Sequence, residues 1–306
     1  MPHPTKFIID FDSTFTQVEA LDILGEISLL NDPERESKLK AIKDITDKGM
    51  EGSLTFRDSL IQRIDILKAN KSQISDLIVA LKQKVSKSFE RNKEFLQDNA
   101  ANIYIISNGF KDFIIPIVAD YGIRRDNVFA NEFIYDDFEN IIDFNRDNPL
   151  SQNNGKSETI KKINLEGEIY VIGDGYTDYE IKKSGLANKF YAFTENVNRP
   201  KVTKEADHIA PSLDEILYVN NLNTKFSYPK SRIKVLLLEN VHQIGVDLLK
   251  EEGYEVEVVS SAMSEEELCE KIKNVSIIGI RSKTNITRKV LENANRLIAV
   301  GPFCIG

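Results

Sequence analysis

Short apolar runs alternate with stretches of helical periodicity along the first two thirds of the chain. The runs predict buried strands and comprise Phe7-Ile8-Ile9, Ile103-Tyr104-Ile105-Ile106 and Ile169-Tyr170-Val171-Ile172, with weaker candidates at 190–193 and 208–210. Between them, Leu and Ile recur at helical spacing over residues 18–90, and helices are also predicted over 111–121 and 156–163. Strands that alternate with helices in this way predict an α/β fold with a doubly wound parallel sheet.

Three segments depart from this simple alternation. The long helical block after the first strand predicts a helical cap over the carboxyl end of that strand. Residues Phe129 to Phe144 interleave polar and apolar side chains and predict a hairpin. Residues 145–155 are rich in Asn, Asp, Ser, Pro and Gly and predict a loop.

A second series of strands and helices begins after the polar segment Asn220 to Ser231, which predicts a linker. Strands are predicted at 233–238, 254–259, 275–280 and 297–300, and helices at 241–252, 264–273 and 287–294. The sequence Ser264-Glu265-Glu266-Glu267 is typical of a helix-opening capping box. We therefore predict a first domain over 1–220 (core 1–15 and 90–220, cap 16–89), a linker over 221–232, and a partial second α/β domain over 233–306.

Composition narrows the class of protein. The chain has 306 residues, 41% hydrophobic and 29% charged, which is typical of a soluble globular protein with room for two domains. A net charge of −8 disfavours nucleic acid and anionic membranes as partners. No apolar run approaches the ~18 residues of a membrane span, and the N-terminus lacks a signal peptide pattern. Two cysteines, Cys269 and Cys304, fit neither a metal site nor a disulfide framework, which favours a cytoplasmic location.

Polar side chains follow three of the predicted strands at the point where each strand ends. These are Asp10 and Asp12, then Ser107, then Asp174 and Asp178, with Lys156 at a helix start between the second and third strands. Ligands bind at the carboxyl ends of the strands in open α/β sheets. Buried carboxylates are costly unless a cation compensates them. We therefore expect these side chains to converge on one edge of the sheet.

The residue types suit phosphoryl transfer. A phosphate monoester repels an attacking carboxylate, and Mg²⁺, which binds carboxylates and phosphate oxygens, offsets this repulsion together with Lys156. Asp10 is placed to act as a nucleophile that becomes transiently phosphorylated. Asp12 could protonate the leaving alkoxide and later activate water, and Ser107 could donate its hydroxyl to a phosphate oxygen.

Structural explanations for the same residues remain open at this point. Asp10 and Asp12 could form a surface turn, and Lys156 could be a surface lysine. Asp178 could be a favourable charge in the first turn of a helix. Glu19 and Arg63 could be solvated charges of the helical block.

The combined motifs resemble the phosphoserine phosphatase family of the haloacid dehalogenase superfamily. They are Asp10-Phe11-Asp12-Ser13-Thr14, Ser107-Asn108-Gly109, Lys156, Gly173-Asp174-Gly175-Tyr176-Thr177-Asp178, and in the cap Glu19, Met50-Glu51-Gly52, Phe56, Ser59-Leu60 and Arg63. The resemblance implies that Asp10 is the nucleophile and Asp12 the acid and base. It also implies that Asp10, the Asp12 carbonyl and Asp174 hold Mg²⁺ with support from Asp178.

The same resemblance implies a set of substrate contacts. Ser107, Asn108 and Lys156 would bind phosphate, with Asn108 standing where the family more often has glycine. Glu19 would bind the substrate ammonium and Arg63 its carboxylate, which arginine can hold bidentately. Met50 and Phe56 would pack around the substrate.

Residues 233–306 resemble a second family, the N-terminal part of D-3-phosphoglycerate dehydrogenase. The resemblance rests on Val235-Leu236-Leu237-Leu238-Glu239, Ile278-Gly279-Ile280-Arg281-Ser282 and the stretch from Leu297 to Gly306. It implies that Arg281 and Ser282 contact a substrate. No G-x-G-x-x-G motif is present, so we expect a truncated dehydrogenase without NAD, and an exposed sheet that promotes homo-oligomers.

These observations favour Mg²⁺-dependent hydrolysis of O-phospho-L-serine to L-serine, a step of serine biosynthesis. Two alternatives remain open. One is phosphatase or phosphotransferase chemistry on another small phosphomonoester, and the other is a catalytically silent binding or regulatory module.

Overall fold

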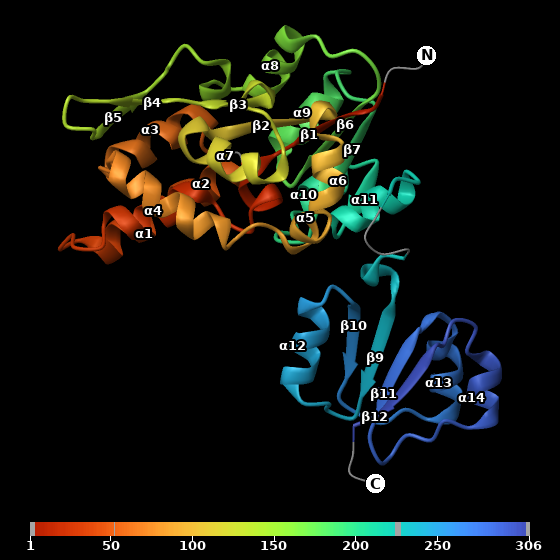
Figure 1. The fold of residues 1–306 in the computed structure, drawn as a ribbon. Helices are drawn as coiled ribbons and strands as arrows, with labels where there is room; N and C mark the ends of the chain where they lie inside the picture. Colours follow the sequence, from red (N-terminus) through yellow and green to blue (C-terminus); the bar gives the residue numbers. More distant parts are fainter. Residues whose placement is uncertain (1–3, 52, 224–227, 304–306) are drawn as a thin grey trace. The chain divides into compact units, whose positions relative to one another are not determined.

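The computed structural model describes residues 4–51, 53–223 and 228–303, except for the side chains of Met50 and Glu51. The chain divides into two compact units, Met1–Ile216 and Leu217–Gly306, which are described separately below (Figure 1). Within the described ranges, no helix has both the length and the apolar character needed to cross a bilayer.

The first unit is built on a six-stranded sheet with the strand order β3-β2-β1-β6-β7-β8. All neighbouring strands are parallel. The strands are β1 (Lys6–Ile9), β2 (Ile103–Phe110), β3 (Val128–Asn131), β6 (Ile169–Gly173), β7 (Lys189–Phe193) and β8 (His208–Ala210). The doubly wound α/β fold predicted from the alternating pattern is therefore confirmed.

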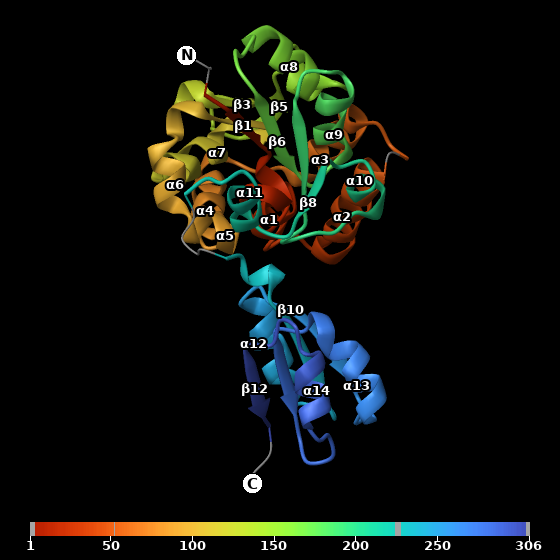
Figure 2. The same cartoon turned by 90° about the vertical axis from the view of Figure 1, so that its right-hand side faces the viewer.

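Helices cover both faces of this sheet (Figure 2). On one face, α8 (Gly155–Ile163) and α9 (Tyr176–Lys183) pack on Ile8, Ile106 and Val171. The other helices of the core are α5 (Lys87–Arg91), α6 (Lys93–Asp98), α7 (Lys111–Val118), α10 (Pro200–Thr203) and α11 (Leu213–Val219). Successive strand residues point to opposite faces, which is why the strands are apolar throughout.

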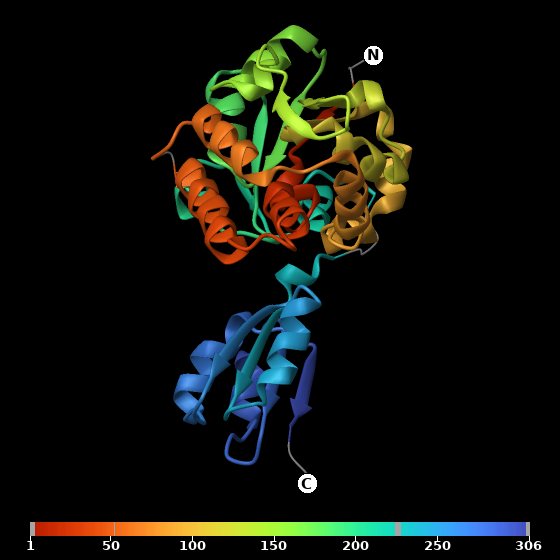
Figure 3. The ribbon, with the colours of Figure 1, turned by 90° about the vertical axis from the view of Figure 1, so that its left-hand side faces the viewer.

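Four helices form the cap between β1 and α5 (Figure 3). They are α1 (Ala20–Ser28), α2 (Arg35–Glu51), α3 (Phe56–Leu67) and α4 (Lys71–Lys82). The chain enters the cap through residues 15–17, the outgoing crossing, and leaves it through residues 84–86, the return crossing. We call these segments together the two crossings. They lie side by side, with Thr16 and Val85 paired as an antiparallel bridge.

Two strand predictions around β2 and β3 were wrong in detail. The strand expected to end at Ile106 continues to Phe110, with a register shift against β3 between these two residues. The predicted hairpin from Phe129 to Phe144 is present only as β4 (Phe133–Tyr135) and β5 (Ile141–Phe144). Its first residues belong to β3, which joins the main sheet because its side chains are mostly buried there.

The second unit is a four-stranded parallel sheet with the order β10-β9-β11-β12. Its strands are β9 (Lys234–Leu238), β10 (Glu255–Val259), β11 (Ile277–Ile280) and β12 (Ala299–Pro302). Figure 1 shows α12 (Gln243–Glu251) on one side of this sheet and α13 (Glu265–Lys271) with α14 (Arg288–Asn293) on the other. The predicted capping box at Ser264 is confirmed, because Ser264 and Glu267 each accept a hydrogen bond from the other's backbone.

Candidate active site

The first group of the site lies in a tight turn directly after β1. Asp10 follows the last residue of the strand, and its carboxylate accepts a hydrogen bond from the backbone N–H of Phe11 at 2.8 Å. Residues Phe11–Phe15, which we call the β1 turn, then reverse the chain toward the cap. Ser13 adopts the left-handed conformation within the turn, with φ 54°. This turn fixes Asp10 and Asp12 at the carboxyl end of the central strand.

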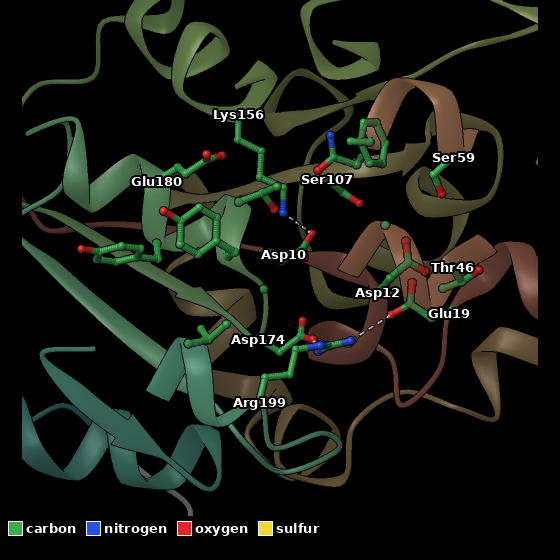
Figure 4. Close-up of a pocket in the computed structure, with 18 of the residues that line it drawn as sticks. Asp10, Asp12, Glu19, Thr46, Ser59, Ser107, Lys156, Asp174, Glu180 and Arg199 are labelled. Atoms are coloured by element: carbon green, nitrogen blue, oxygen red, sulfur yellow. Dashed lines mark ion pairs between the residues drawn. The ribbon is translucent and has the colours of Figure 1, made fainter. Parts of the chain in front are cut away.

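Lys156 lies between two carboxylates. Its Nζ atom is 2.9 Å from Oδ1 of Asp10 (Figure 4). The same atom is 2.7 Å from Oδ1 of Asp178. The lysine side chain is 3% exposed, so its charge depends on these partners. Burial alone lowers the pKa of a lysine, but Asp10 and Asp178 outweigh it and raise the pKa of Lys156 above its ordinary value. The Lys156 ammonium is therefore retained at neutral pH.

Three carboxylates could hold a metal ion at this edge of the sheet. Oxygen atoms of Asp10, Asp174 and Asp178 all lie within 4.8 Å of one another. Asp178 also accepts a hydrogen bond from the N–H of Gly175, and burial raises its pKa to about 7. Thr14 donates its hydroxyl to Asp174 at 3.0 Å. An all-oxygen set of this kind fits the ligand preference of Mg²⁺.

Asp12 has a different environment from Asp10. Its Oδ1 atom accepts a hydrogen bond from the backbone N–H of Ala20, the first residue of α1, at 2.7 Å. Burial raises the pKa of the Asp12 carboxyl well above its usual range, and the nearby Glu19 and Asp10 carboxylates raise it further. Asp10 and Asp12 therefore differ in environment. Asp10 is paired with Lys156, whereas burial favours the protonated form of Asp12.

A cavity of about 1070 Å³ joins these core residues to the cap. The predicted site residues that line it are Asp10, Asp12, Glu19, Phe56, Arg63, Ser107, Asn108, Lys156 and Asp174. Asp178 is not part of the lining, because it is buried next to Lys156. The side chain of Met50 is outside the described part of the structure.

The cap contributes an acid and an arginine to this cavity. Glu19 accepts a hydrogen bond from the Ser13 hydroxyl at 2.6 Å, which orients it from the β1 turn. Arg63, in α3, is 6% exposed, and its Nε atom donates to the Ser59 carbonyl at 3.4 Å. Burial raises the pKa of the Glu19 carboxyl. The solvated-charge explanation is wrong for Arg63, because its side chain is buried.

Ser107 and Asn108 lie within β2 at the cavity wall. The Ser107 hydroxyl accepts a hydrogen bond from the N–H of Gly109 at 2.9 Å. Asn108 donates its side-chain amide to the carbonyl of Leu150 at 2.8 Å. The Asn108 amide is thereby held by the segment before α8.

Arg199 is a cavity residue that the sequence did not point to. It lies in the loop between β7 and α10, directly before Pro200, and it contacts the Asp174 carboxylate. Its guanidinium is also 4.0 Å from Oε1 of Glu19 (Figure 4). An Arg-Pro pair in a loop carries no chemical signature, so no sequence signal identifies Arg199.

Arg281 and Ser282 lie in the second unit, directly after β11. Both side chains are exposed, and a guanidinium nitrogen of Arg281 donates to the Glu239 carbonyl at 3.3 Å. The Glu239 carboxylate accepts hydrogen bonds from the N–H groups of Lys283 and Thr284. A buried glutamate therefore shapes the loop that carries the predicted Arg-Ser pair.

A comparison with known protein families shows to which family the first unit belongs. The haloacid dehalogenase-like hydrolase family matches residues 7–181, more than half of the chain. The chain belongs to that family. The haloacid dehalogenase-like match spans Asp10, the β1 turn and the cap. It also includes Ser107 and Lys156, and it ends just after Asp178.

Two relatives resemble this haloacid dehalogenase-like part closely. A phosphoserine phosphatase of Drosophila melanogaster is 31% identical over 212 residues, covering 68% of this chain and 75% of the relative. The crystal structure of a phosphoserine phosphohydrolase-like protein from Francisella tularensis aligns with a TM-score of 0.63 and 31% identity. That alignment covers 71% of this chain and 99% of that protein.

The second unit matches a different family. Residues 235–306 match the catalytic domain of D-isomer specific 2-hydroxyacid dehydrogenases. A putative D-3-phosphoglycerate dehydrogenase of Schizosaccharomyces pombe is 61% identical over 74 residues, which are 24% of this chain and 16% of that protein. The chain therefore joins a haloacid dehalogenase-like hydrolase to a segment similar to part of a dehydrogenase.

Proposed function

We propose that the first unit hydrolyses O-phospho-L-serine to L-serine and phosphate. The observation that carries the proposal is the shared cavity. Asp10, Lys156 and Ser107 line it from the core, and Glu19 and Arg63 line it from the cap side. The first set suits a phosphate group, and the second suits an ammonium and a carboxylate. Phosphoserine carries all three groups on one small molecule.

In the proposed reaction, Asp10 attacks the phosphorus atom and forms an aspartyl phosphate as the bond to the serine oxygen breaks. Asp12 gives its proton to the leaving oxygen, so that L-serine departs as a neutral alcohol. Asp12 then takes a proton from water as that water attacks the phosphoryl group. Phosphate leaves and Asp10 is restored. The raised pKa of Asp12 supports its role as the acid in the first step.

Lys156 and Ser107 are the proposed phosphate contacts. The Lys156 ammonium would stabilise negative charge on the transferred group, and the Ser107 hydroxyl can donate to a phosphate oxygen. Asp10 and Asp174, with support from Asp178 and the Asp12 carbonyl, would hold Mg²⁺. When bound, this ion supplies positive charge that offsets the repulsion between a carboxylate and a phosphate dianion.

The cap side would decide which phosphate ester is accepted. Glu19 is the proposed partner of the substrate ammonium and Arg63 of its carboxylate, which a guanidinium can bind through two parallel hydrogen bonds. Phe56 and Met50 are proposed to pack against the substrate. Because Arg63 is buried, its interaction with a carboxylate would be screened little by solvent.

We further propose that this reaction serves serine biosynthesis in the cytoplasm, with no nucleic acid or membrane as partner. Homo-oligomer formation through the exposed sheet of the second unit is part of the same proposal. The matched stretch of the second unit is 16% of its dehydrogenase relative, so the catalytic proposal covers the first unit alone. Arg281 and Ser282 remain proposed substrate contacts of that second unit.

The deciding experiment is phosphate release by the full chain, measured with and without Mg²⁺. The substrates are O-phospho-L-serine, O-phospho-D-serine, glycerol 3-phosphate and p-nitrophenyl phosphate. We expect Mg²⁺-dependent turnover with phosphoserine preferred. Equal rates for all four esters would contradict the roles of Glu19 and Arg63. Transfer of phosphate to an added alcohol instead of water would favour the phosphotransferase alternative.

A further inference from the structure

The loop between β7 and α10 contacts both crossings between the core and the cap. This loop, residues 194–199, follows β7 directly and ends with Arg199, which precedes α10. Glu195 accepts hydrogen bonds from the backbone N–H and the hydroxyl of Ser88, just past the return crossing. Asn196 reaches the crossings themselves, and Arg199 reaches the cavity. One short segment is therefore in contact with the base of the cap and with the site.

Among these three loop residues, Asn196 makes hydrogen bonds to the largest number of different segments. Its side-chain amide nitrogen donates to the carbonyl of Ser13 at 3.1 Å and to the carbonyl of Thr16 at 3.3 Å. The same nitrogen donates to the hydroxyl oxygen of Ser86 at 2.7 Å. Two amide hydrogens thus serve three acceptors, which belong to the β1 turn, the outgoing crossing and the return crossing. No other residue type of this size supplies two donors from one planar nitrogen.

The acceptors of Asn196 are themselves part of the link between the crossings. Ser86 donates its hydroxyl to the Thr14 carbonyl at 2.6 Å, and its backbone N–H donates to the Phe15 carbonyl at 2.9 Å. Gln17 bonds back to the return crossing through its backbone, which donates to the Lys84 carbonyl at 2.7 Å. Cap motion relative to the core must bend the chain at these two crossings, because the cap has no other covalent connection to the core.

The consequences for the site follow from the neighbours of Asn196. Ser13, whose carbonyl Asn196 holds, also donates its hydroxyl to Glu19, the proposed ammonium partner. Three residues after Asn196 in the same loop, Arg199 contacts Asp174 and approaches Glu19. A shift of the crossings would therefore reach Glu19 through Ser13 and reach Asp174 through Arg199.

We infer that Asn196 is a positioning residue that couples the two cap crossings to the β1 turn and to Arg199. It touches neither substrate nor the reacting atoms, and it acts through Ser13, Thr16 and Ser86. For its effect on turnover the inference rests on the proposed phosphatase function. For its effect on the crossings it stands on the hydrogen bonds alone.

The test compares Asn196→Asp and Asn196→Ala with the unmodified full chain. Aspartate keeps the shape but has no donor for the three oxygen atoms and is repelled by them, whereas alanine removes the donors without adding charge. A loss that both variants share therefore identifies the missing hydrogen bonds as the cause. Ser86→Ala is a second variant that removes one of the three acceptors in case the Asn196 variants fold poorly. Asn31→Ala, which removes an exposed asparagine amide in the turn between α1 and α2, is the matched control.

The first readout is amide hydrogen exchange of the full chain, followed in peptides that cover residues 12–18, residues 84–89 and strand β6. We expect exchange in the two crossing segments to accelerate about tenfold in the Asn196 variants, the factor that loss of one buried hydrogen bond produces. Exchange in β6 should stay unchanged, and Asn31→Ala should match the unmodified chain. Unchanged exchange at the crossings would overturn the inference. An equal acceleration in β6 would also overturn it, because it would reveal general loosening of the unit.

The second readout is kcat for phosphoserine. We expect about a tenfold loss in both Asn196 variants and a smaller loss in Ser86→Ala. Faster exchange at the crossings with an unchanged kcat would overturn the coupling to the site. If the unmodified chain releases no phosphate from phosphoserine, the proposed function fails, and hydrogen exchange still decides whether Asn196 holds the crossings together.

Discussion

The Nζ atom of Lys156 lies 2.9 Å from Oδ1 of Asp10. The same ammonium is 2.7 Å from Asp178, so Asp10 is one of two anionic partners. Replacing Asp10 with asparagine removes the nucleophile but leaves the buried lysine paired with Asp178. We expect Asp10→Asn to abolish phosphate release, with a loss of at least about a thousandfold, and to leave the melting temperature within a few degrees. Retained turnover in a steady-state assay would contradict the role of Asp10.

Removal of Lys156 should lower the stability of the first unit, in addition to the loss of turnover expected for a phosphate contact. Lys156→Ala leaves the buried Asp178 carboxylate and the partly buried Asp10 carboxylate without their shared cation, and breaking a buried ion pair typically costs about 3–5 kcal/mol. Denaturant unfolding should detect this loss, and added Mg²⁺ should restore part of it by binding the same carboxylates in the folded state. Lys161→Ala in the same helix is the control, since its ion pair with Glu158 is about half exposed and contributes little to stability.

Arg63 should affect one substrate far more than another. Loss of a hydrogen-bonded charged partner costs about 1.5–3 kcal/mol, or roughly 10–150-fold. We expect Arg63→Ala to lower kcat/KM for phosphoserine by that factor and to change the value for p-nitrophenyl phosphate much less. Arg63→Lys keeps the charge but loses the planar fork, and it should remain impaired toward phosphoserine. Equal losses on both esters would argue against a carboxylate contact.

Gly173, the last residue of β6, tests how closely Asp178 packs against the strand. A Cβ atom at Gly173 would lie 2.2 Å from Cγ of Asp178, so Gly173→Ala must displace that carboxylate. We expect destabilisation of about 1–3 kcal/mol or more in urea unfolding, together with weaker Mg²⁺ binding. At Gly175 a Cβ atom would meet its nearest neighbour at an ordinary 3.4 Å, so Gly175→Ala should change stability much less.

Glu239 should make the second unit sensitive to acid. Burial alone raises the pKa of Glu239, but hydrogen bonds from Thr284 and Lys283 outweigh it and hold the pKa below the ordinary value of 4.5. A carboxyl with a lowered folded pKa stabilises the fold above its unfolded pKa, and that stabilisation is lost as pH falls through the folded pKa. Below about pH 4.5, protection of the β9 and β11 amides should therefore decline once intrinsic exchange rates are corrected.

Glu239→Gln removes the titrating group, and it should flatten this decline while lowering protection at pH 7. Glu255→Gln changes an exposed acid of the same unit and should retain the pH dependence of the unmodified chain. An identical pH profile in Glu239→Gln would contradict the assignment.

Several features of the fold and site were predictable because they follow from local patterns. Apolar runs that end in Asp10, Ser107 or Asp174 must deliver those side chains to one edge of a parallel sheet, and the structure places all three at one cavity. The role of Glu19 and Arg63 as cavity residues came from family resemblance, because helical charges alone do not reveal which face of a helix is buried.

Other features depended on contacts that no local pattern encodes. The polar and apolar alternation near Phe129 resembled a hairpin, yet pairing with β2 drew Val128–Asn131 into the main sheet. Arg199 and Asn196 lie in an irregular loop, and their importance arises from partners in other segments. The acceptors of Asn196 are 110 to 183 positions away, and Arg199 contacts Asp174 and approaches Glu19. Long-range hydrogen bonds of this kind leave no periodic signal in the sequence.

The three carboxylates that could hold a divalent ion are each paired with a positive side chain. Arg199 contacts Asp174, and Lys156 lies between Asp10 and Asp178. Proteins whose sites assemble only around the ion lose their fold when a chelator removes it. In this protein the two positive side chains would instead keep the carboxylates compensated, so that the first unit stays folded when no divalent ion is bound. Ion binding would then need only a local rearrangement of these side chains and no refolding of the chain.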